Sequence, residues 1–290
     1  MAPSRHFPGW LWPNLLSLDA PLVAVAWYAF FARAHHGKLS APDAALLFLT
    51  VWIIYVLDRL LDGRNSANIA ALQQRHKFCK RHRAEFAAAL VIAALACAFI
   101  VARYLAPSEI VSGLNLAAIV ALYMIGVHAS RGRIALLVPK EIAVGAVFAA
   151  GVALPFWSHA AKLTEPAVLP WIFFAVLCAL NCLAIECWEA PATFNERASG
   201  MQISPFVRWA LPRLNAIAAA LALTAFLAAI LLHSGASPFG VFWAVAFAAL
   251  SLLAANLLKN KIPPALLRVL ADAALLLPPA VALLLLAFRL

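Results

Sequence analysis

The stretch VWIIYVLDRLLDGRN, residues 51–65, begins as one of the most apolar runs of the chain and ends in two carboxylates and two arginines. Asp58 and Asp62 are four residues apart, so a helix places them on one face, one turn apart. Two acids at the end of a membrane helix are costly unless they meet a cation, a partner or water. One interpretation is a solvated helix end whose aspartates pair with Arg59 and Arg64. The other is a divalent-metal site for a phosphate ester, because Mg²⁺ is usually held by one or two carboxylates together with substrate phosphates.

The composition around this stretch is that of a polytopic membrane protein. Of the 290 residues, 66% are hydrophobic and only 12% are charged, and the mean hydropathy is +0.92. A soluble domain carries roughly twice that charged fraction. Since a membrane-spanning helix needs about 20 apolar residues, we predict an all-α bundle of about nine transmembrane helices in one integral membrane domain, residues 1–290. The nine apolar runs are about 15–34, 43–61, 86–105, 108–128, 136–157, 167–187, 207–232, 238–258 and 265–288.

The net charge of +10 is distributed unevenly over the predicted loops. With nine spans, seventeen of the 22 Lys and Arg residues fall on the side of the N-terminus and five on the other side. The positive-inside rule then predicts a cytoplasmic N-terminus and an external C-terminus. We expect an integral protein of a bacterial inner membrane, in contact with membrane lipid. Because the basic residues follow alternate loops, we expect no nucleic-acid partner.

A second polar cluster ends the sixth predicted span, in NCLAIECWEAPATFNER, residues 181–197. Asn181 and Glu189 are eight residues apart, close to one helix face, and Glu186 precedes Glu189 by three, which makes the two acids neighbours. The predicted topology places this cluster on the cytoplasmic side, as it does the Asp58 and Asp62 pair. Two separate helix ends are thus acidic on the side where Lys and Arg are in excess, which indicates a single site.

Two basic segments lie on the same predicted side. The stretch RHKFCKRHR, residues 75–83, is either a topogenic cluster that touches anionic headgroups or a phosphate-binding lid beside the two aspartates. Lys140 opens the fifth span and either pairs with Glu141 at the interface or points into a cytoplasmic cavity at a phosphate. Gly145 and Gly151, farther along this span, permit close approach of a neighbouring helix.

Two further acidic residues lie in the first and last predicted spans. Asp19 either faces the interior of the bundle or caps a helix that starts in SLDAP. The cap is the preferred interpretation, because a proline two residues later is common at a helix start. Asp272 follows Arg268 by four residues, which predicts an ion pair at the membrane interface.

These features resemble the UbiA superfamily of intramembrane prenyltransferases, which has nine transmembrane helices and Asp-rich motifs at the cytoplasmic ends of the second and sixth. Asp58 and Asp62 match the D-x-x-x-D of the first motif. Ile54 and Tyr55 stand where the family has Asn and Asp. In the second motif the family has two or three Asp, and this chain has Asn181, Glu186 and Glu189. Residues 75–83 are similar to the family's lid region, and residues 131–151 resemble its basic turn and glycine-bearing fifth helix.

The resemblance implies a magnesium-dependent transfer of a prenyl group from an allylic prenyl diphosphate to a lipophilic acceptor. Metal ions would act as Lewis acids on the leaving phosphates, basic residues would neutralise the pyrophosphate charge, and the apolar bundle would shield the carbocation from water. The implied catalytic metal ligands are Asp58, Asp62, Glu186 and Glu189. The implied substrate-binding residues are Asn181, Lys140, Arg131, Lys80, Arg81 and Arg59.

Two other functions stay open at the level of sequence. One is a catalytically inactive UbiA-like membrane protein that binds a prenyl lipid or a partner, which the departures from the two motifs favour. The other is a secondary transporter. A transporter needs polar residues near the membrane midplane and broken helices. The predicted charged residues lie mostly at one membrane–water interface, which argues against a transporter.

Overall fold

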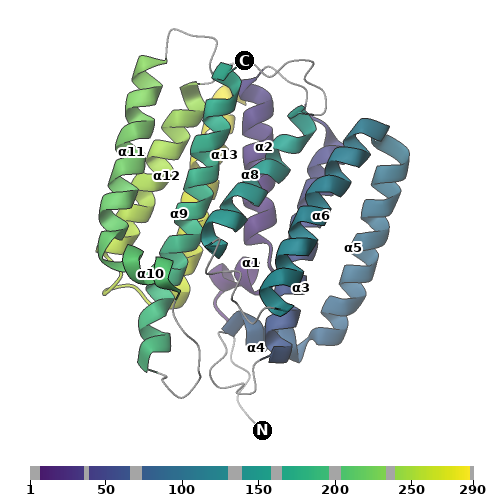
Figure 1. Cartoon of the computed structure of the whole chain (residues 1–290), viewed down its shortest axis with the longest axis horizontal. Helices are drawn as coiled ribbons and strands as arrows, with labels where there is room; N and C mark the ends of the chain where they lie inside the picture. Colours follow the sequence, from purple (N-terminus) through teal and green to yellow (C-terminus); the bar gives the residue numbers. More distant parts are fainter. Residues whose placement is uncertain are drawn as a thin grey trace.

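The protein is a bundle of long apolar helices, as a computed structural model shows (Figure 1). The structure describes residues 7–35, 39–65, 74–129, 139–157, 165–195, 204–232 and 239–287, and a few residues within helices, Asp62 among them, by their backbone alone. The helices are η1 (Gly9–Leu11), α1 (Trp12–Leu15), α2 (Asp19–Ala34), α3 (Ala41–Asn65), α4 (Gln74–Arg81), α5 (Arg83–Tyr104), α6 (Pro107–Ala129), α8 (Lys140–Trp157), α9 (Glu165–Asn195), α10 (Pro205–Ala210), η3 (Leu211–Arg213), α11 (Leu214–Leu231), α12 (Phe239–Leu257) and α13 (Pro264–Ala287). No strand occurs in these ranges, and the predicted all-α class is confirmed.

Seven of these helices are long and apolar enough to cross a membrane by themselves. An eighth crossing results if the pair formed by residues 9–15 and α2, which is bent by 84°, counts as one span. The break lies at Ser17, whose backbone φ of 60° is in the left-handed region that few non-glycine residues adopt. The predicted count of nine spans is therefore not confirmed over the described ranges.

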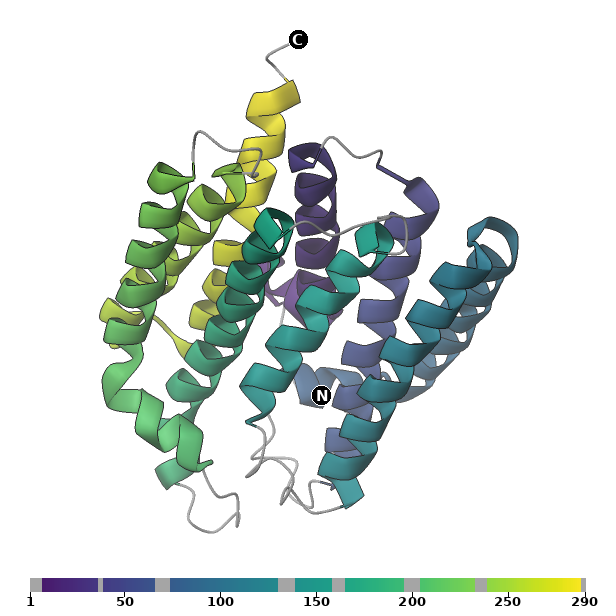
Figure 2. The same cartoon turned by 45° about the horizontal axis from the view of Figure 1, so that its top comes forward.

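Successive long helices run up and down the bundle, so alternate helix ends gather at each end (Figures 1 and 2). At one end, the lower one in Figure 1, α3 and α9 finish, α8 and α13 begin, and the short helices α1 and α4 lie beside them. We call this end of the bundle the site end. Both predicted acidic clusters lie on helices that finish here.

Large aromatic side chains form the core between α2 and α9. Trp27 stacks on Phe174 with ring centroids 4.3 Å apart, and Phe31 stacks on Trp171 at 3.5 Å. The indole Nε1 of Trp27 donates to the backbone oxygen of Leu275, 2.9 Å away, which ties α13 to α2. A buried indole N–H needs such a partner, and its pairing fixes three helices together.

Gly145 brings α8 and α9 into close contact. A Cβ atom at this position would lie only 2.5 Å from the backbone nitrogen of Ala179. Only glycine permits this approach, as the sequence indicated. Gly151 faces no such limit, because a Cβ atom there would have Leu116 Cδ2 as its nearest neighbour, at 3.9 Å.

The outer surface of the bundle is apolar. Large hydrophobic side chains on α5 and α6 are more than half exposed, and they are Val91, Ile92, Leu95, Phe99, Val111, Leu114, Ile119, Leu122 and Ile125. A surface of this kind is unstable in water and suits contact with lipid tails. The structure thus supports a membrane protein.

Candidate functional site

The helix α3 carries the first predicted acidic pair. It is continuous over Ala41–Asn65, so Asp58 and Asp62 do lie one turn apart on one helix. Asp58 is exposed at the site end, while the side chain of Asp62 lies outside the described residues. The exposed position leaves the Asp58 carboxylate accessible to a ligand from that end.

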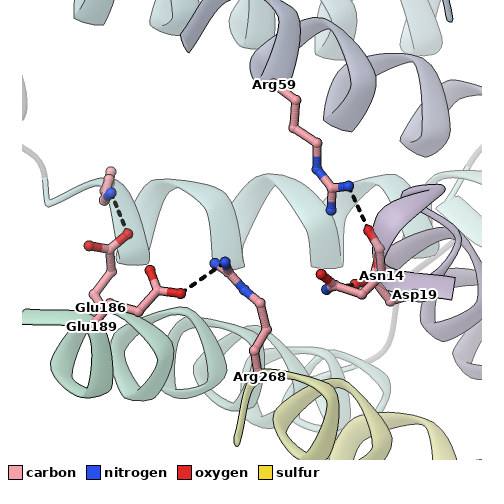
Figure 3. Close-up of polar contacts among 7 residues, drawn as sticks. Asn14, Asp19, Arg59, Glu186, Glu189 and Arg268 are labelled. Atoms are coloured by element: carbon pink, nitrogen blue, oxygen red, sulfur yellow. Dashed lines mark hydrogen bonds and ion pairs between the residues drawn. The ribbon is translucent and has the colours of Figure 1, made fainter. Parts of the chain in front are cut away.

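Arg59, between these aspartates, has a structural contact that the sequence did not indicate. Its side chain is only 4% exposed, and Nη1 donates to the carbonyl oxygen of Asn14 at 2.6 Å (Figure 3). The same atom donates to the carbonyl oxygen of Leu15 at 3.4 Å. The last carbonyls of a helix lack partners within it, and a cation is favourable at that terminus. Arg59, predicted to bind substrate, therefore holds α1 against α3.

The second acidic cluster meets cations from two other helices. Glu186 Oε1 lies 2.5 Å from Lys140 Nζ at the start of α8, and Glu189 Oε1 lies 2.9 Å from Arg268 Nη1 at the start of α13 (Figure 3). Asp58 is also close enough to act electrostatically on Lys140. Residues from α3, α8, α9 and α13 are thus brought together at the site end.

The predicted pairing of Lys140 with Glu141 is wrong. Its ammonium group contacts Glu186, and the alternative pairing with Glu141 does not occur. Glu141 is instead 1% exposed, and neither of its carboxylate oxygens has a hydrogen-bond partner in the part of the chain that the structure describes.

A separate polar group lies deeper in the bundle. Asp19 begins α2, and its Oδ2 accepts from Asn14 Nδ2 at 2.6 Å. Asp272 on α13 acts electrostatically with Asp19, and with Asn181 it lines one small cavity. The preferred cap is not confirmed, because the N-cap of α2 is Leu18, without a side-chain cap hydrogen bond; Asp19 lies in the first turn, where its Oδ1 accepts from the backbone nitrogen of Ala20 at 3.1 Å.

Arg268 forms its ion pair with Glu189 and acts on Asp272, the predicted partner, only electrostatically. Asn181 lies beside Asp272 rather than with the two glutamates.

The basic segment after α3 forms the helix α4, which packs against the site end. The ring of Phe78 contacts the rings of Trp12 and Phe86 edge to face at 5.9 and 6.2 Å. These contacts fasten α4 to α1 and α5. On the helix, Arg81 is exposed and Lys80 is partly buried. Arg131, the remaining predicted basic residue, lies outside the described residues.

Arg75 at the start of α4 lies among charges from four other helices. It interacts electrostatically with Arg268, Arg59, Glu189 and Asp19. Burial, and next the repulsion from Arg268 and Arg59, lower the pKa of Arg75 to about 9, so the guanidinium is still charged at neutral pH. Three arginines from α3, α4 and α13 thus lie near one another at the site end, and a bound anion would relieve their repulsion.

The described carboxylates do not assemble a metal site on their own. No group of three or more His, Cys, Asp or Glu side chains with ligand geometry occurs among the side chains that are placed. Glu186 and Glu189 are each engaged by a cation, so in this arrangement they do not fit the predicted role of metal ligands. Asp58 is exposed, and Asp58 and Asp62 are the remaining candidates for metal ligands.

Comparison of the chain with protein-family models, with curated proteins and with solved structures gave no match. The function is therefore argued from the site itself.

Sequence reasoning missed two of the site's features. Arg75 stands out in the sequence only as part of a basic segment, because its neighbours Arg59 and Arg268 are distant in the chain. Asp272 carried a usable signal, since an acid well inside an apolar run points to a function by default. The i, i+4 spacing to Arg268 obscured that signal.

Proposed function

We propose that this protein is a UbiA-like intramembrane prenyltransferase, which transfers a prenyl group from an allylic prenyl diphosphate to a lipophilic acceptor. The observation that carries the proposal is the approach of Arg59, Arg75 and Arg268 to one another at the end of an apolar bundle. Like charges that act on one another favour a multiply charged anion between them. The apolar bundle beside them suits a long hydrocarbon tail, so the preferred ligand carries both groups.

In this proposal the basic residues bind the diphosphate. Arg75 lies in the first turn of α4, and Lys80 and Arg81 lie farther along the same helix. Lys140 begins α8. Their charges stabilise the negative charge that grows on pyrophosphate as it leaves. Arg131 is proposed to join them.

Asp58 and Asp62 are the proposed holders of Mg²⁺, because this ion is usually bound by one or two carboxylates plus substrate phosphates. When bound, the ion supplies Lewis-acid polarisation of the diphosphate oxygens. Glu186 and Glu189 keep Lys140 and Arg268 in position in the observed arrangement. The proposal therefore assigns these glutamates to positioning the cations.

We further propose that the site end faces the cytoplasm of a bacterial inner membrane, with the N-terminus on the same side and the C-terminus outside. The excess of Lys and Arg in the segments on this side supports that orientation. Prenyl diphosphates would then enter from the cytoplasmic leaflet.

The test is a transfer assay with full-length protein in detergent or bilayer nanodiscs. Labelled prenyl diphosphates of several lengths are incubated with Mg²⁺ and a panel of lipophilic acceptors, and released pyrophosphate and prenylated product are measured. The proposal expects both products from the wild type and a large loss in Asp58→Ala and Asp62→Ala. Equal pyrophosphate release by wild type and both variants contradicts it.

A second candidate is a catalytically inactive protein that binds a prenyl lipid or a partner on the same scaffold. The observation in its favour is that cations engage both glutamates of the second motif. This candidate expects binding of prenyl diphosphates without pyrophosphate release, whichever acceptor is added. The same assay therefore separates it from the transferase.

A third candidate, a secondary transporter, is favoured by the bend of 84° between residues 9–15 and α2 and by the polar contacts of Asp272 inside the bundle. Both are features of transporter binding sites. Uptake of a labelled solute by proteoliposomes, driven by an ion gradient and without any chemical change, would support this candidate over the other two.

A further inference from the structure

The part of the chain that runs from α10 to the start of α13 carries positive charge without any acid. The sequence has no Asp or Glu between Glu196 and Asp272. The basic residues in the described ranges of this segment are Arg208, Arg213, Lys259, Lys261 and Arg268. Arg268 forms its ion pair with Glu189. The other four make no ion pair within the part of the chain that the structure describes, so their charges are not balanced locally.

These four basic residues lie at the site end of the bundle. Arg208 is on α10, and Arg213 ends η3, directly before α11 begins. Lys259 and Lys261 lie in the turn between the end of α12 and the start of α13. Since α11 begins and α12 ends at the same end of the bundle (Figure 1), the four residues occupy neighbouring helix ends. All four are exposed.

A chain of side-chain hydrogen bonds holds these helix ends together. Trp188 Nε1 on α9 donates to Asn256 Oδ1 on α12 at 2.8 Å, and Asn256 Nδ2 donates to Asn215 Oδ1 on α11 at 2.7 Å. Asn215 follows Arg213 by two residues, and Lys259 follows Asn256 by three. Buried polar groups need such partners, and their pairing fixes the start of α11 beside the end of α12. The basic residues of the two segments therefore share one corner of the bundle.

An exposed indole ring belongs to the same corner. Trp209 is 50% exposed and stacks on Phe206, with ring centroids 5.9 Å apart. The guanidinium carbon of Arg213 lies 5.3 Å from the centroid of the Trp209 ring, and its Nη1 donates to the Trp209 carbonyl at 2.9 Å. A cation–π contact and a hydrogen bond thus orient the Arg213 side chain. Tryptophan at the end of an apolar helix is typical of the headgroup level of a membrane.

We call this group of side chains the basic corner. Its members are Arg208, Trp209, Arg213, Lys259 and Lys261. The helices α11 and α12, which meet at the basic corner, present large exposed apolar side chains along their length, and they are Leu223, Phe226, Leu227, Ile230, Phe247, Leu250 and Leu257. Such a surface suits lipid tails. The headgroups of the same lipids would lie at the helix ends, beside the basic corner.

We propose that the basic corner binds the headgroup of an anionic phospholipid whose acyl chains lie along α11 and α12. The guanidinium of Arg213 donates to the lipid phosphate, as the planar fork of arginine suits phosphate oxygens, and Lys259 adds a second positive charge from the turn. Basic pockets between transmembrane helices bind anionic headgroups in this way. The absence of acids in the segment favours this partner by charge complementarity. The inference does not depend on the proposed transferase activity.

The first arm of the test measures lipid affinity by native mass spectrometry. Full-length protein, freed of lipid in a neutral detergent, is titrated with anionic phosphatidylglycerol and with zwitterionic phosphatidylcholine of the same acyl chains. The wild type should bind phosphatidylglycerol more tightly. Arg213→Gln/Lys259→Gln should weaken the tightest phosphatidylglycerol about 10–30-fold, because each basic residue near a membrane surface contributes about fivefold to the attraction of anionic lipid.

A matched control separates the basic corner from net charge. Arg33→Gln/Arg103→Gln removes the same number of charges from exposed positions in the last turns of α2 and α5. These helices end at the opposite end of the bundle (Figure 1). This variant should keep the affinity of the wild type for phosphatidylglycerol. An equal loss in both double variants would mean that overall charge, and not the basic corner, attracts the lipid, which overturns the inference.

The second arm locates the bound lipid. Lipids that carry bromine on the acyl chains near the headgroup quench indole fluorescence at short range. Brominated phosphatidylglycerol should quench the wild type more than brominated phosphatidylcholine does. This difference should be largely lost in Trp209→Phe and kept in Trp243→Phe, which alters another indole on α12. A difference that survives in Trp209→Phe overturns the proposed position.

The remaining outcomes are equally decisive. Unchanged affinity in Arg213→Gln/Lys259→Gln overturns the inference. Equal affinity of the wild type for the two lipids also overturns it, and it leaves an acidic segment of another protein as the alternative partner. Neither arm uses a prenyl diphosphate, so a failure here leaves the proposed function standing.

Discussion

Glu189 on α9 and Arg268 on α13 form an ion pair of 2.9 Å that joins two helices at the site end, and their side chains are only 22% and 13% exposed. Lys140 and Glu186 form the second pair, with exposed fractions of 50% and 34%. Because solvent screens the exposed pair more strongly, the two pairs should differ in the free energy of unfolding that they contribute.

A double-mutant cycle measures this difference. We expect a coupling free energy of about 1–3 kcal/mol between Arg268→Met and Glu189→Gln, and of about 1 kcal/mol or less between Lys140→Met and Glu186→Gln. Unfolding of each set of four proteins in mixed detergent micelles gives both values. A larger coupling for the Lys140 pair would mean that the Arg268 contact is not the stronger link.

The close approach of α8 to α9 predicts different results for two glycines of one helix. Gly145→Ala forces a Cβ atom to within 2.5 Å of the Ala179 backbone, and such overpacking typically costs about 1–3 kcal/mol. Gly151→Ala is the matched control, because its Cβ would meet only an ordinary contact. Thermal unfolding in detergent should show a lower Tm for Gly145→Ala alone, and equal Tm values for the two variants would contradict the packing.

Membrane orientation gives a third prediction. The helix α4 should lie in the cytoplasm, and the turn at residues 105–106 between α5 and α6 should lie outside, because Lys and Arg are concentrated on the side of α4. Single cysteines in each segment, on a background without native cysteines, can be labelled in intact cells with a membrane-impermeant reagent. Labelling of the α4 position together with protection of the turn would contradict the predicted orientation.

The helices of this bundle are largely predictable from hydropathy and length. Asp58, Asp62 and the apolar run that precedes them fall on one continuous helix, as their spacing indicates. The count of spans is less predictable, because the bend at Ser17 divides the first apolar region into two short segments. No composition rule locates such a bend.

The partners of the polar residues are not predictable from local spacing. Arg268 and Asp272 are neighbours on one helix, yet tertiary packing gives Arg268 its ion-pair partner, Glu189, on another helix. Lys140 likewise contacts Glu186 rather than the adjacent Glu141. Helical spacing shows which side chains share a face, whereas the relative placement of helices decides which of them meet.

The fourth prediction concerns catalysis at α3. Asp58→Asn and Asp62→Asn keep the side-chain shape and remove the charge proposed to hold Mg²⁺, so turnover should fall on the order of 10²–10³-fold, as for loss of one interaction that stabilises transition-state charge. The loss should appear in kcat more than in KM. Glu85→Gln, an exposed acid at the start of α5, is the control and should keep wild-type turnover. Unchanged kcat in both aspartate variants would remove α3 from the proposed chemistry.

The central claim is that the arginines at the site end bind a prenyl diphosphate, and equilibrium binding tests it most directly. A non-cleavable thiolo-diphosphate analogue with a prenyl tail is titrated into full-length protein with Mg²⁺ present, so that chemistry does not interfere. The wild type should bind the analogue. Arg75→Gln should weaken binding about 10–100-fold, as expected for loss of a charged hydrogen bond, and Lys261→Gln, in the exposed turn before α13, should bind as the wild type does. Absence of binding by the wild type, or equal affinity in Arg75→Gln, would contradict the account.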